Sequence, residues 1–224
     1  MNLHAPQPDR LLQRHQLVRV RPDAWSAWLA SRSDLANEPL LPGWMDRGWP
    51  LIVRRPAPGD GSGWPLGLPL PPSAGKRRIA IQMAAGDIIS TTPLPTLVEC
   101  VDTAPAAWRL SLRELATHAS AYGVEARVFG SLAWQRLTGL AYLSPGSDLD
   151  IVWTFPQRNR LNWFLSDLVD IESRAPIRID GELLRADGAG VNWRELHSGV
   201  PELVLKTAAD VILCQRESLI GMSS

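Results

Sequence analysis

A glycine–serine pair and a pair of aspartates lie close together in the chain. Gly130 and Ser131 follow an apolar run, and Asp148 and Asp150, separated by one residue, follow a turn of sequence SPGS. Glycine and serine at the start of a helix present backbone N–H groups and a hydroxyl to an anion. Side chains two residues apart on a strand point to the same face, so we expect the two carboxylates side by side.

The chemistry of these residues suits phosphoryl or nucleotidyl transfer. Neighbouring carboxylates repel each other unless a cation screens them, and Mg²⁺ suits one or two carboxylates together with substrate phosphates. We predict that Asp148 and Asp150 hold Mg²⁺ while Gly130 and Ser131 hold phosphate. The alternative is that the two aspartates form a solvated strand end.

A third carboxylate normally completes such a site. The main candidate is Asp180, within a strand-like segment at 177–184, where it could accept the proton of the nucleophile or bind a second metal. Its Asp-Gly pair could instead form a hairpin turn, but the pair at 187–188 is the stronger turn signal. Glu182, on the same strand face, is the alternative third acid.

Strand and helix patterns alternate around these residues and must position them. Strand patterns occupy 124–129, 148–155, 177–184 and 189–193, and helix patterns occupy 111–123, 131–137 and 160–174. They predict an α+β protein whose C-terminal domain, 101–224, is a mixed sheet with helices. We also expect Trp134, Trp153, Trp163 and Trp193, at apolar positions, to be core.

The first half has a different pattern. Short apolar runs at 51–55 and 78–83 are separated by turns rich in Pro and Gly, which predicts a smaller β-rich domain over 1–100. The segment 56–76 is too rich in Pro and Gly for regular structure. We expect it to be an ordered loop whose tryptophan and leucines lie against the protein.

Composition limits the possible partners and locations. The 224 residues include 23 Lys and Arg and 23 Asp and Glu, so no overall positive field attracts nucleic acid, and we expect no nucleic-acid partner. The two cysteines form no metal or disulfide motif, which favours a reducing compartment. The N-terminus has no apolar leader pattern and no stretch is long enough to span a membrane, so we expect a cytoplasmic protein.

Three basic clusters could complete a phosphate pocket, although each residue could equally be a solvated charge. They are Arg54 with Arg55, Lys76 with Arg77 and Arg78, and Lys206 near the C-terminus. If the first two clusters bind substrate, the N-terminal domain forms one wall of the site.

The order Gly-Ser, helix, Asp-x-Asp and later acidic strand residue resembles the nucleotidyltransferase fold of the DNA polymerase beta type. A closer resemblance is to the malonate decarboxylase holo-[acyl-carrier-protein] synthase family, the phosphoribosyl-dephospho-CoA transferases. It is carried by VFGSLAWQRLTGLAYLSPGSDLDIVW at 128–153, with RHQLV at 14–18, WPLIVRRP at 49–56, GLPLPPSAGKRRIA at 67–80, RIDGELLRADG at 178–188 and LVLKT at 203–207.

The family resemblance implies a reaction. A serine hydroxyl of the apo acyl-carrier subunit of malonate decarboxylase attacks the α-phosphate of 2'-(5''-triphosphoribosyl)-3'-dephospho-CoA, and pyrophosphate leaves. Gly130 and Ser131 would then hold the triphosphate, Asp148 and Asp150 the Mg²⁺, and Asp180 would assist deprotonation of the serine. Two alternatives stay open: a nucleotidyltransferase that uses an ordinary NTP, and a non-catalytic nucleotide-binding scaffold.

Overall fold

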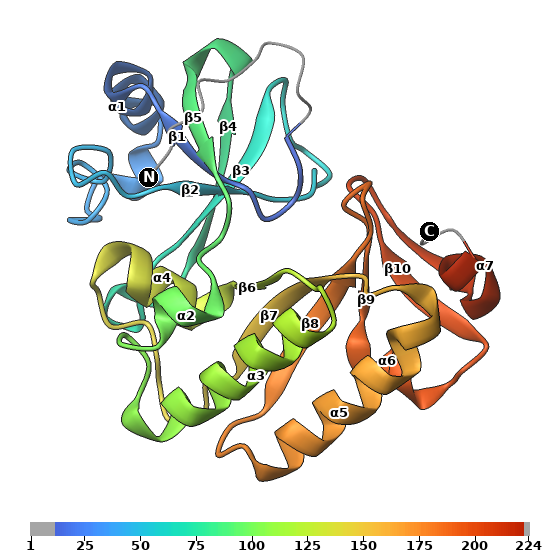
Figure 1. Ribbon diagram of the computed structural model, residues 1–224. Coiled ribbons are helices and arrows are strands. Elements are labelled where there is room, and N and C mark those ends of the chain that lie inside the picture. The colour runs from blue at the N-terminus through green and yellow to red at the C-terminus, as the bar shows by residue number, and fades with distance from the viewer. Residues whose placement is uncertain (1–11, 222–224) are drawn as a thin grey trace. The chain divides into compact units, whose positions relative to one another are not determined.

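The chain folds into two compact units, 1–94 and 95–224, each built around its own sheet (Figure 1). This computed structural model describes residues 12–221. The expectation that the N-terminus has no apolar leader pattern falls partly on residues 1–11, which lie outside the described residues. The described residues form a mixed α+β protein with two sheets and seven α-helices. No helix within them is long and apolar enough to cross a membrane.

The first unit is an antiparallel five-stranded sheet with strand order β4-β3-β2-β1-β5. Its elements are β1 (Leu17–Val20), α1 (Pro22–Ala30), β2 (Leu51–Val53), β3 (Trp64–Pro69), β4 (Arg78–Met83) and β5 (Ile88–Thr92). Helix α1 begins with Pro22, whose fixed φ and missing N–H suit the first helical position. Trp25 and Trp44 are almost fully buried, so this unit has an apolar core of its own.

Strand β3 corrects the expectation that 56–76 has no regular structure. It pairs with β4 over six residues, and Leu66 and Leu68, both fully buried, lie opposite Ile81 and Ile79. The expectation was wrong because alternating apolar side chains, each buried on one sheet face, outweigh the low strand propensity of proline and glycine. The stretches on either side of β3 form turns, loops and a short 3₁₀ helix at Pro72–Ala74.

The second unit is a six-stranded mixed sheet with strand order β11-β10-β9-β8-β7-β6, in which only the β7–β8 pair is parallel. Its helices are α2 (Leu97–Cys100), α3 (Arg109–Ala121), α4 (Gly130–Thr138), α5 (Leu161–Arg174), α6 (Trp193–Ser198) and α7 (Arg216–Gly221). Its strands are β6 (Ala126–Val128), β7 (Leu149–Thr154), β8 (Ile179–Leu184), β9 (Gly190–Asn192), β10 (Glu202–Lys206) and β11 (Val211–Gln215).

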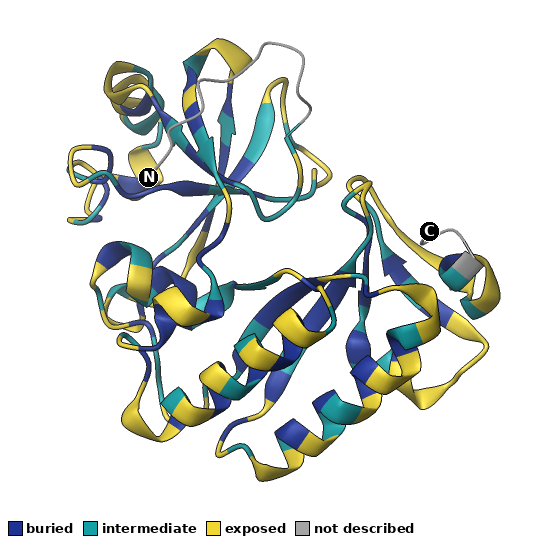
Figure 2. Ribbon diagram, in the orientation of Figure 1, coloured by how far each residue is buried: buried dark blue, intermediate teal, exposed yellow. Residues whose placement is uncertain are grey.

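Helices α3 and α5 cover one face of this sheet (Figure 1). The strand residues under them are buried, including Ile151 and Leu183, while the outer sides of both helices are exposed (Figure 2). Trp134, Trp153 and Trp193 are buried as expected, but the expectation for Trp163 was wrong, because this residue of α5 is 70% exposed. The helices pack against the apolar side of β7 and β8. Polar side chains of these two strands can therefore lie on the opposite side.

Candidate active site

The glycine–serine turn and the second aspartate of the Asp-x-Asp pair meet in the second unit. Strand β6 passes directly into α4 at Gly130, and the Phe129 N–H donates to the Asp150 carbonyl at 3.0 Å. Gly130 has a φ of +64°, and a Cβ at this position would lie 1.9 Å from Asp150 Oδ2. Glycine thus allows both the left-handed backbone and the close approach of the carboxylate.

The first turn of α4 carries the serine of the motif. Ser131 is half-buried, and its hydroxyl forms no hydrogen bond with any residue of the described chain. Phe129 precedes the helix in an extended conformation, and its side chain does not cap the first N–H groups. A free hydroxyl beside helix N–H groups is an arrangement that suits a phosphate oxygen.

Asp148 lies just before β7, where the SPGS turn places it. In this turn the Ser144 N–H donates to Ser147 Oγ at 2.9 Å, and the Ser147 N–H donates to the Ser144 carbonyl at 3.0 Å. The Asp148 side chain is 37% exposed, and its Oδ2 lies 3.4 Å from Nη1 of Arg178. The carboxylate is therefore partly screened by one cation and still open to solvent.

Strand pairing brings the third acid beside the pair. The parallel register of β7 and β8 sets Asp150 directly opposite Asp180, so both side chains leave the same sheet face. Asp180 Oδ1 accepts hydrogen bonds from the Gly181 N–H at 2.9 Å and from Asn192 Nδ2 at 3.2 Å. Arg194 interacts favourably with Asp180 and Asp148, and its bond to Glu172, the largest cause, raises the pKa of its guanidinium.

Glu182 and Lys206 form an ion pair with each other. Glu182 is buried, and its Oε1 accepts a 2.6 Å hydrogen bond from Lys206 Nζ. Glu182, two residues after Asp180 on β8, also pairs with Asn192 of β9. Its carboxylate thus accepts a hydrogen bond from a lysine, whereas the hydrogen-bond donors to Asp180 among the described residues, the Gly181 N–H and Asn192 Nδ2, are neutral.

The other predicted basic residues belong to the first unit. Arg54 donates to the Leu66 and Arg55 carbonyls and binds both oxygens of Asp60, and this guanidinium holds the pKa of Asp60 well below its usual range. Arg55 is half-buried, and Arg77 binds Glu38 at 2.6 Å. Lys76 and Arg78 are exposed next to the β3–β4 turn.

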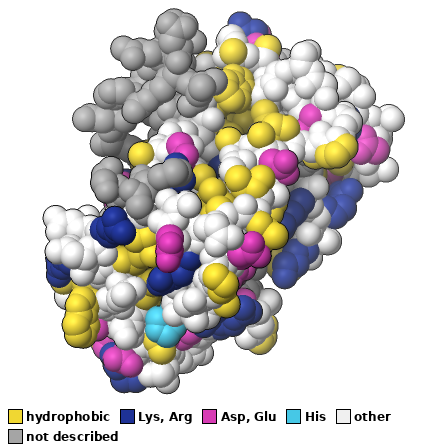
Figure 3. Space-filling view, turned by 90° about the vertical axis from the view of Figure 1, so that its right-hand side faces the viewer, with side chains coloured by type: hydrophobic (Ala, Val, Ile, Leu, Met, Phe, Trp, Pro, Cys, Tyr) yellow, Lys and Arg dark blue, Asp and Glu magenta, His cyan; other side chains and the backbone are white. Residues whose placement is uncertain are grey.

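Surface charge is mixed elsewhere as well. On the face drawn in Figure 3, basic and acidic side chains are interspersed with apolar ones, in line with the equal numbers of basic and acidic residues. A phosphate-bearing ligand therefore has to be recognised by a few local groups.

Two residues that organise the site, Gln135 and Asn192, were not among the site residues predicted from the sequence. Gln135 of α4 accepts hydrogen bonds from the N–H groups of Tyr142 and Leu143, so it anchors the loop that leads to Asp148. Asn192 caps α6 by accepting from the Arg194 N–H at 2.9 Å and also contacts Asp180. The Gln135 contact is local to the motif, but the Asn192 contact depends on strand pairing.

The donor set around Asp150 suits a metal that substrate phosphates help to bind. Within residues 12–221 no cluster of three or more His, Cys, Asp or Glu side chains has the geometry of a metal site. Asp148, just before β7, and Asp150, on β7, nonetheless supply two carboxylates, with Asp180 in register beside Asp150. Mg²⁺ commonly uses one or two carboxylates and completes its shell with waters and phosphates.

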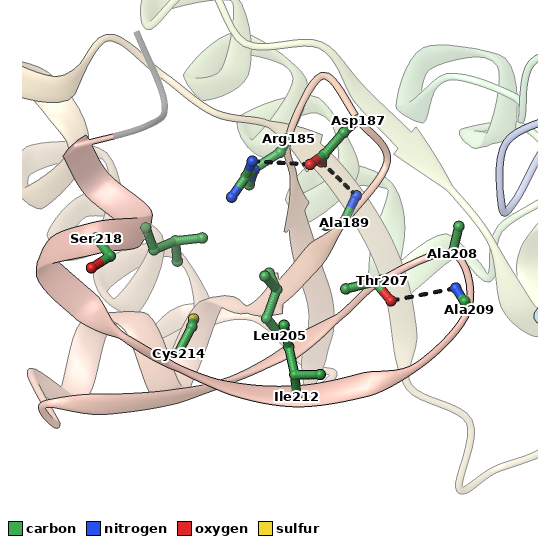
Figure 4. A pocket seen from close by; sticks show the side chains of 11 residues that line it. Arg185, Asp187, Ala189, Leu205, Thr207, Ala208, Ala209, Ile212, Cys214 and Ser218 are labelled. Atoms are coloured by element: carbon green, nitrogen blue, oxygen red, sulfur yellow. Dashed lines mark hydrogen bonds and ion pairs between the residues drawn. The ribbon is translucent and has the colours of Figure 1, made fainter.

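A separate pocket of about 540 Å³ lies in the second unit between the β8–β9 turn, the β10–β11 hairpin and α7 (Figure 4). Leu205, Ile212 and Cys214 line it, and burial raises the pKa of the Cys214 thiol. Its residue Arg185 follows the C-terminal end of β8, whereas Asp180 lies near the start of that strand. The pocket contains none of the residues predicted for the site.

Comparisons with known proteins cover nearly the whole chain. Residues 13–93 match the family model of the phosphoribosyl-dephospho-CoA transferase MdcG N-terminal domain, and residues 96–217 match that of its C-terminal domain. No solved structure matches the chain.

Curated relatives carry the same name. A phosphoribosyl-dephospho-CoA transferase of Bradyrhizobium diazoefficiens is 45% identical over 213 residues, 95% of this chain and 94% of the relative. One of Xanthomonas campestris pv. campestris is 37% identical over 92% of this chain and 95% of its own, and one of Pseudomonas aeruginosa is 28% identical over 76% and 80%. The chain belongs to the phosphoribosyl-dephospho-CoA transferase family.

Proposed function

We propose that this chain transfers the phosphoribosyl-dephospho-CoA group from 2'-(5''-triphosphoribosyl)-3'-dephospho-CoA to a serine hydroxyl of the apo acyl-carrier subunit of malonate decarboxylase. A bond forms between the serine oxygen and the α-phosphorus, the bond from that phosphorus to the β-phosphate oxygen breaks, and pyrophosphate leaves. The observation that carries the proposal is the contact of Asp150 with Gly130, because it joins a carboxylate to a phosphate-binding helix start.

Asp148 and Asp150 would hold Mg²⁺ in this reaction. Bound there, the ion would neutralise charge on the triphosphate and on the leaving pyrophosphate. The two carboxylates are hard oxygen donors at the start of β7, and the partial exposure of Asp148 leaves room for a ligand that brings its own phosphate oxygens. While no substrate is bound, Arg178 would reduce the repulsion between the two carboxylates.

The first turn of α4 would bind the phosphates. Ser131 would donate its unused hydroxyl to a phosphate oxygen, so it is a ligand of the substrate and not a nucleophile. Helix N-termini favour anions through their free N–H groups and the helix dipole. The same turn touches the Asp150 carboxylate, so phosphate and metal ligands would belong to one site.

Asp180 would accept the proton of the incoming serine. It is the better third acid because it lies opposite Asp150 and carries no cationic partner in contact with its oxygens among the described residues. Glu182, by contrast, is buried and its oxygen is engaged by Lys206, which disfavours a change of its charge during turnover.

The fold that we propose for the second unit is the nucleotidyltransferase fold of the DNA polymerase beta type. Its support is the order of elements: a strand, a helix that begins with Gly-Ser, a strand with Asp-x-Asp around its first residue and a parallel neighbour bearing the third acid. Helices α3 and α5 lie along one face of the sheet (Figure 1), and Asp150 and Asp180, paired in register, share one face of their strands.

The direct test mixes the purified chain with MgCl₂, the apo carrier subunit and the triphosphoribosyl substrate. Release of pyrophosphate and a gain in carrier mass equal to the prosthetic group are expected. EDTA should stop both, and added Mg²⁺ should restore them. Turnover of ATP with no mass gain on the carrier would instead indicate an ordinary NTP substrate, and binding without pyrophosphate release would indicate a scaffold.

A further inference from the structure

We infer that Asn192 is a positioning residue that orients the Asp180 carboxylate and leaves its Oδ2 as the reactive oxygen. The inference rests on the proposed function, because it assigns the oxygen that accepts the proton. Asn192 stands at the end of β9, where that strand passes into α6, and it contacts Asp180 across the sheet.

The side-chain amide of Asn192 is held at both ends. Its Oδ1 accepts from the Arg194 N–H at 2.9 Å and so caps α6, while its Nδ2 donates to Asp180 Oδ1 at 3.2 Å. Strand pairing restricts backbone movement on both sides of this contact, because Asn192 pairs with Glu182, two residues after Asp180. An amide whose oxygen is engaged by a helix start has one orientation left, with its NH₂ toward the carboxylate.

Both donors to Asp180 reach the same oxygen. The Gly181 N–H donates to Oδ1 at 2.9 Å, in addition to Asn192 Nδ2. Within the described part of the chain, Oδ2 accepts no hydrogen bond. Two donors on one oxygen set the rotation of the carboxylate about its Cβ–Cγ bond and leave the lone pairs of the other oxygen for a proton.

The arrangement predicts a loss of rate and not of binding. Without the Nδ2 donor, Asp180 can rotate, and small errors in the position of a reacting group are costly to the chemical step. Substrate affinity depends on other groups, so KM should change little. The residue therefore acts through Asp180, and its effect should vanish when Asp180 is removed.

The test uses a variant that separates the cap from the donor. Asn192→Ser retains an oxygen that can cap α6, but it offers no NH₂ to Asp180. We expect kcat to fall about tenfold or more, KM for both substrates to stay within about threefold, and the melting temperature to remain near that of the unmodified chain. Asn162→Ser, on the exposed side of α5, is the matched control and should leave all three values unchanged.

A double-mutant cycle and one spectroscopic readout make the result decisive. In an Asp180→Ala background, Asn192→Ser should change the residual kcat by less than about twofold. Independently of activity, Asp180→Ala should shift the ¹⁵N-labelled Asn192 side-chain NH₂ signals. The inference is overturned if folded Asn192→Ser transfers at the unmodified rate, if its loss persists without Asp180, or if those signals do not move. Failure of the unmodified chain to transfer would refute the proposed function instead.

Discussion

Asp150 Oδ2 lies against Gly130, so close that a Cβ at residue 130 would be 1.9 Å from it. This contact joins the two parts of the motif that stand twenty residues apart in the chain. It also means that residue 130 cannot carry a side chain unless Asp150 or α4 moves. The glycine is therefore required by the carboxylate as well as by the backbone.

Gly130→Ala should abolish transfer and destabilise the protein. The new methyl group must displace the Asp150 carboxylate, and alanine must also adopt a φ of +64°. We expect transfer to fall more than about a hundredfold and the free energy of unfolding to fall by about 1–3 kcal/mol. Pyrophosphate release and urea unfolding measure the two effects.

Gly139→Ala is the control for the first prediction. Gly139 follows the other end of α4 with a φ of +74°, but a Cβ there meets nothing within 4 Å. It should show a backbone cost of about 1 kcal/mol and nearly full activity. Equal losses of activity in the two variants would show that helix strain, and not the carboxylate contact, matters.

Asp148→Asn should stop transfer while the fold persists. The substitution removes one of the two proposed metal ligands but is nearly isosteric, and its ion pair with Arg178 is long and partly exposed. We expect a loss of activity of more than about a hundredfold and a change in stability of less than about 1 kcal/mol. Asp170→Asn, exposed on α5, serves as control, and full transfer by Asp148→Asn would remove Asp148 from the metal site.

Much of the site follows from local sequence. Alternation along 148–155 predicts that Asp148 and Asp150 leave one face while Ile151 and Trp153 enter the core, and those two residues are almost fully buried. The helix predicted at 131–137 is part of α4, which begins at Gly130. Local pattern is enough here because the periodicity of a strand or helix determines which side chains share a face.

Long-range pairing could not be deduced from the sequence. The positions of Asp180 opposite Asp150 and of Asn192 beside Asp180 follow from strand register, which no local signal gives. The ion pair between Lys206 and Glu182 joins residues 24 apart in sequence. In the first unit, β3 was not predicted because its proline and glycine residues have low strand propensity, although its leucines alternate and are buried on one face of the sheet.

Lys206→Met separates a structural role of this lysine from substrate binding. Loss of the ammonium removes the ion pair between Lys206 and the buried Glu182 carboxylate, and breaking such a pair in a largely water-excluded place is unfavourable. We expect the free energy of unfolding to fall by about 1–3 kcal/mol, measured with urea. The exposed Lys76→Met should stay within about 0.5 kcal/mol. A fully stable Lys206→Met variant with a raised KM would identify Lys206 as a substrate ligand.

His118 should make stability fall on mild acidification. Burial lowers the pKa of this histidine of α3, and the groups around it are Phe164, whose carbonyl lies 3.1 Å from Nε2, Tyr122, and Asp167, 4.0 Å from Nδ1. The unfolded chain takes up the proton near pH 6.5, whereas the folded chain does so only at lower pH. Stability is therefore complete above about pH 6.5 and declines below it by at most about 1.4 kcal/mol per pH unit.

Urea unfolding at pH 7.5, 6.5 and 5.5 tests this linkage. His118→Gln should be less stable at pH 7.5, because it loses the ring contact with Phe164. On acidification, however, its free energy of unfolding should fall less than that of the unmodified chain, because the contribution of His118 is absent. The exposed His197→Gln should decline as the unmodified chain does. If His118→Gln loses stability with the same slope, carboxylates and not His118 cause the acid sensitivity, since their protonation would contribute equally in both proteins.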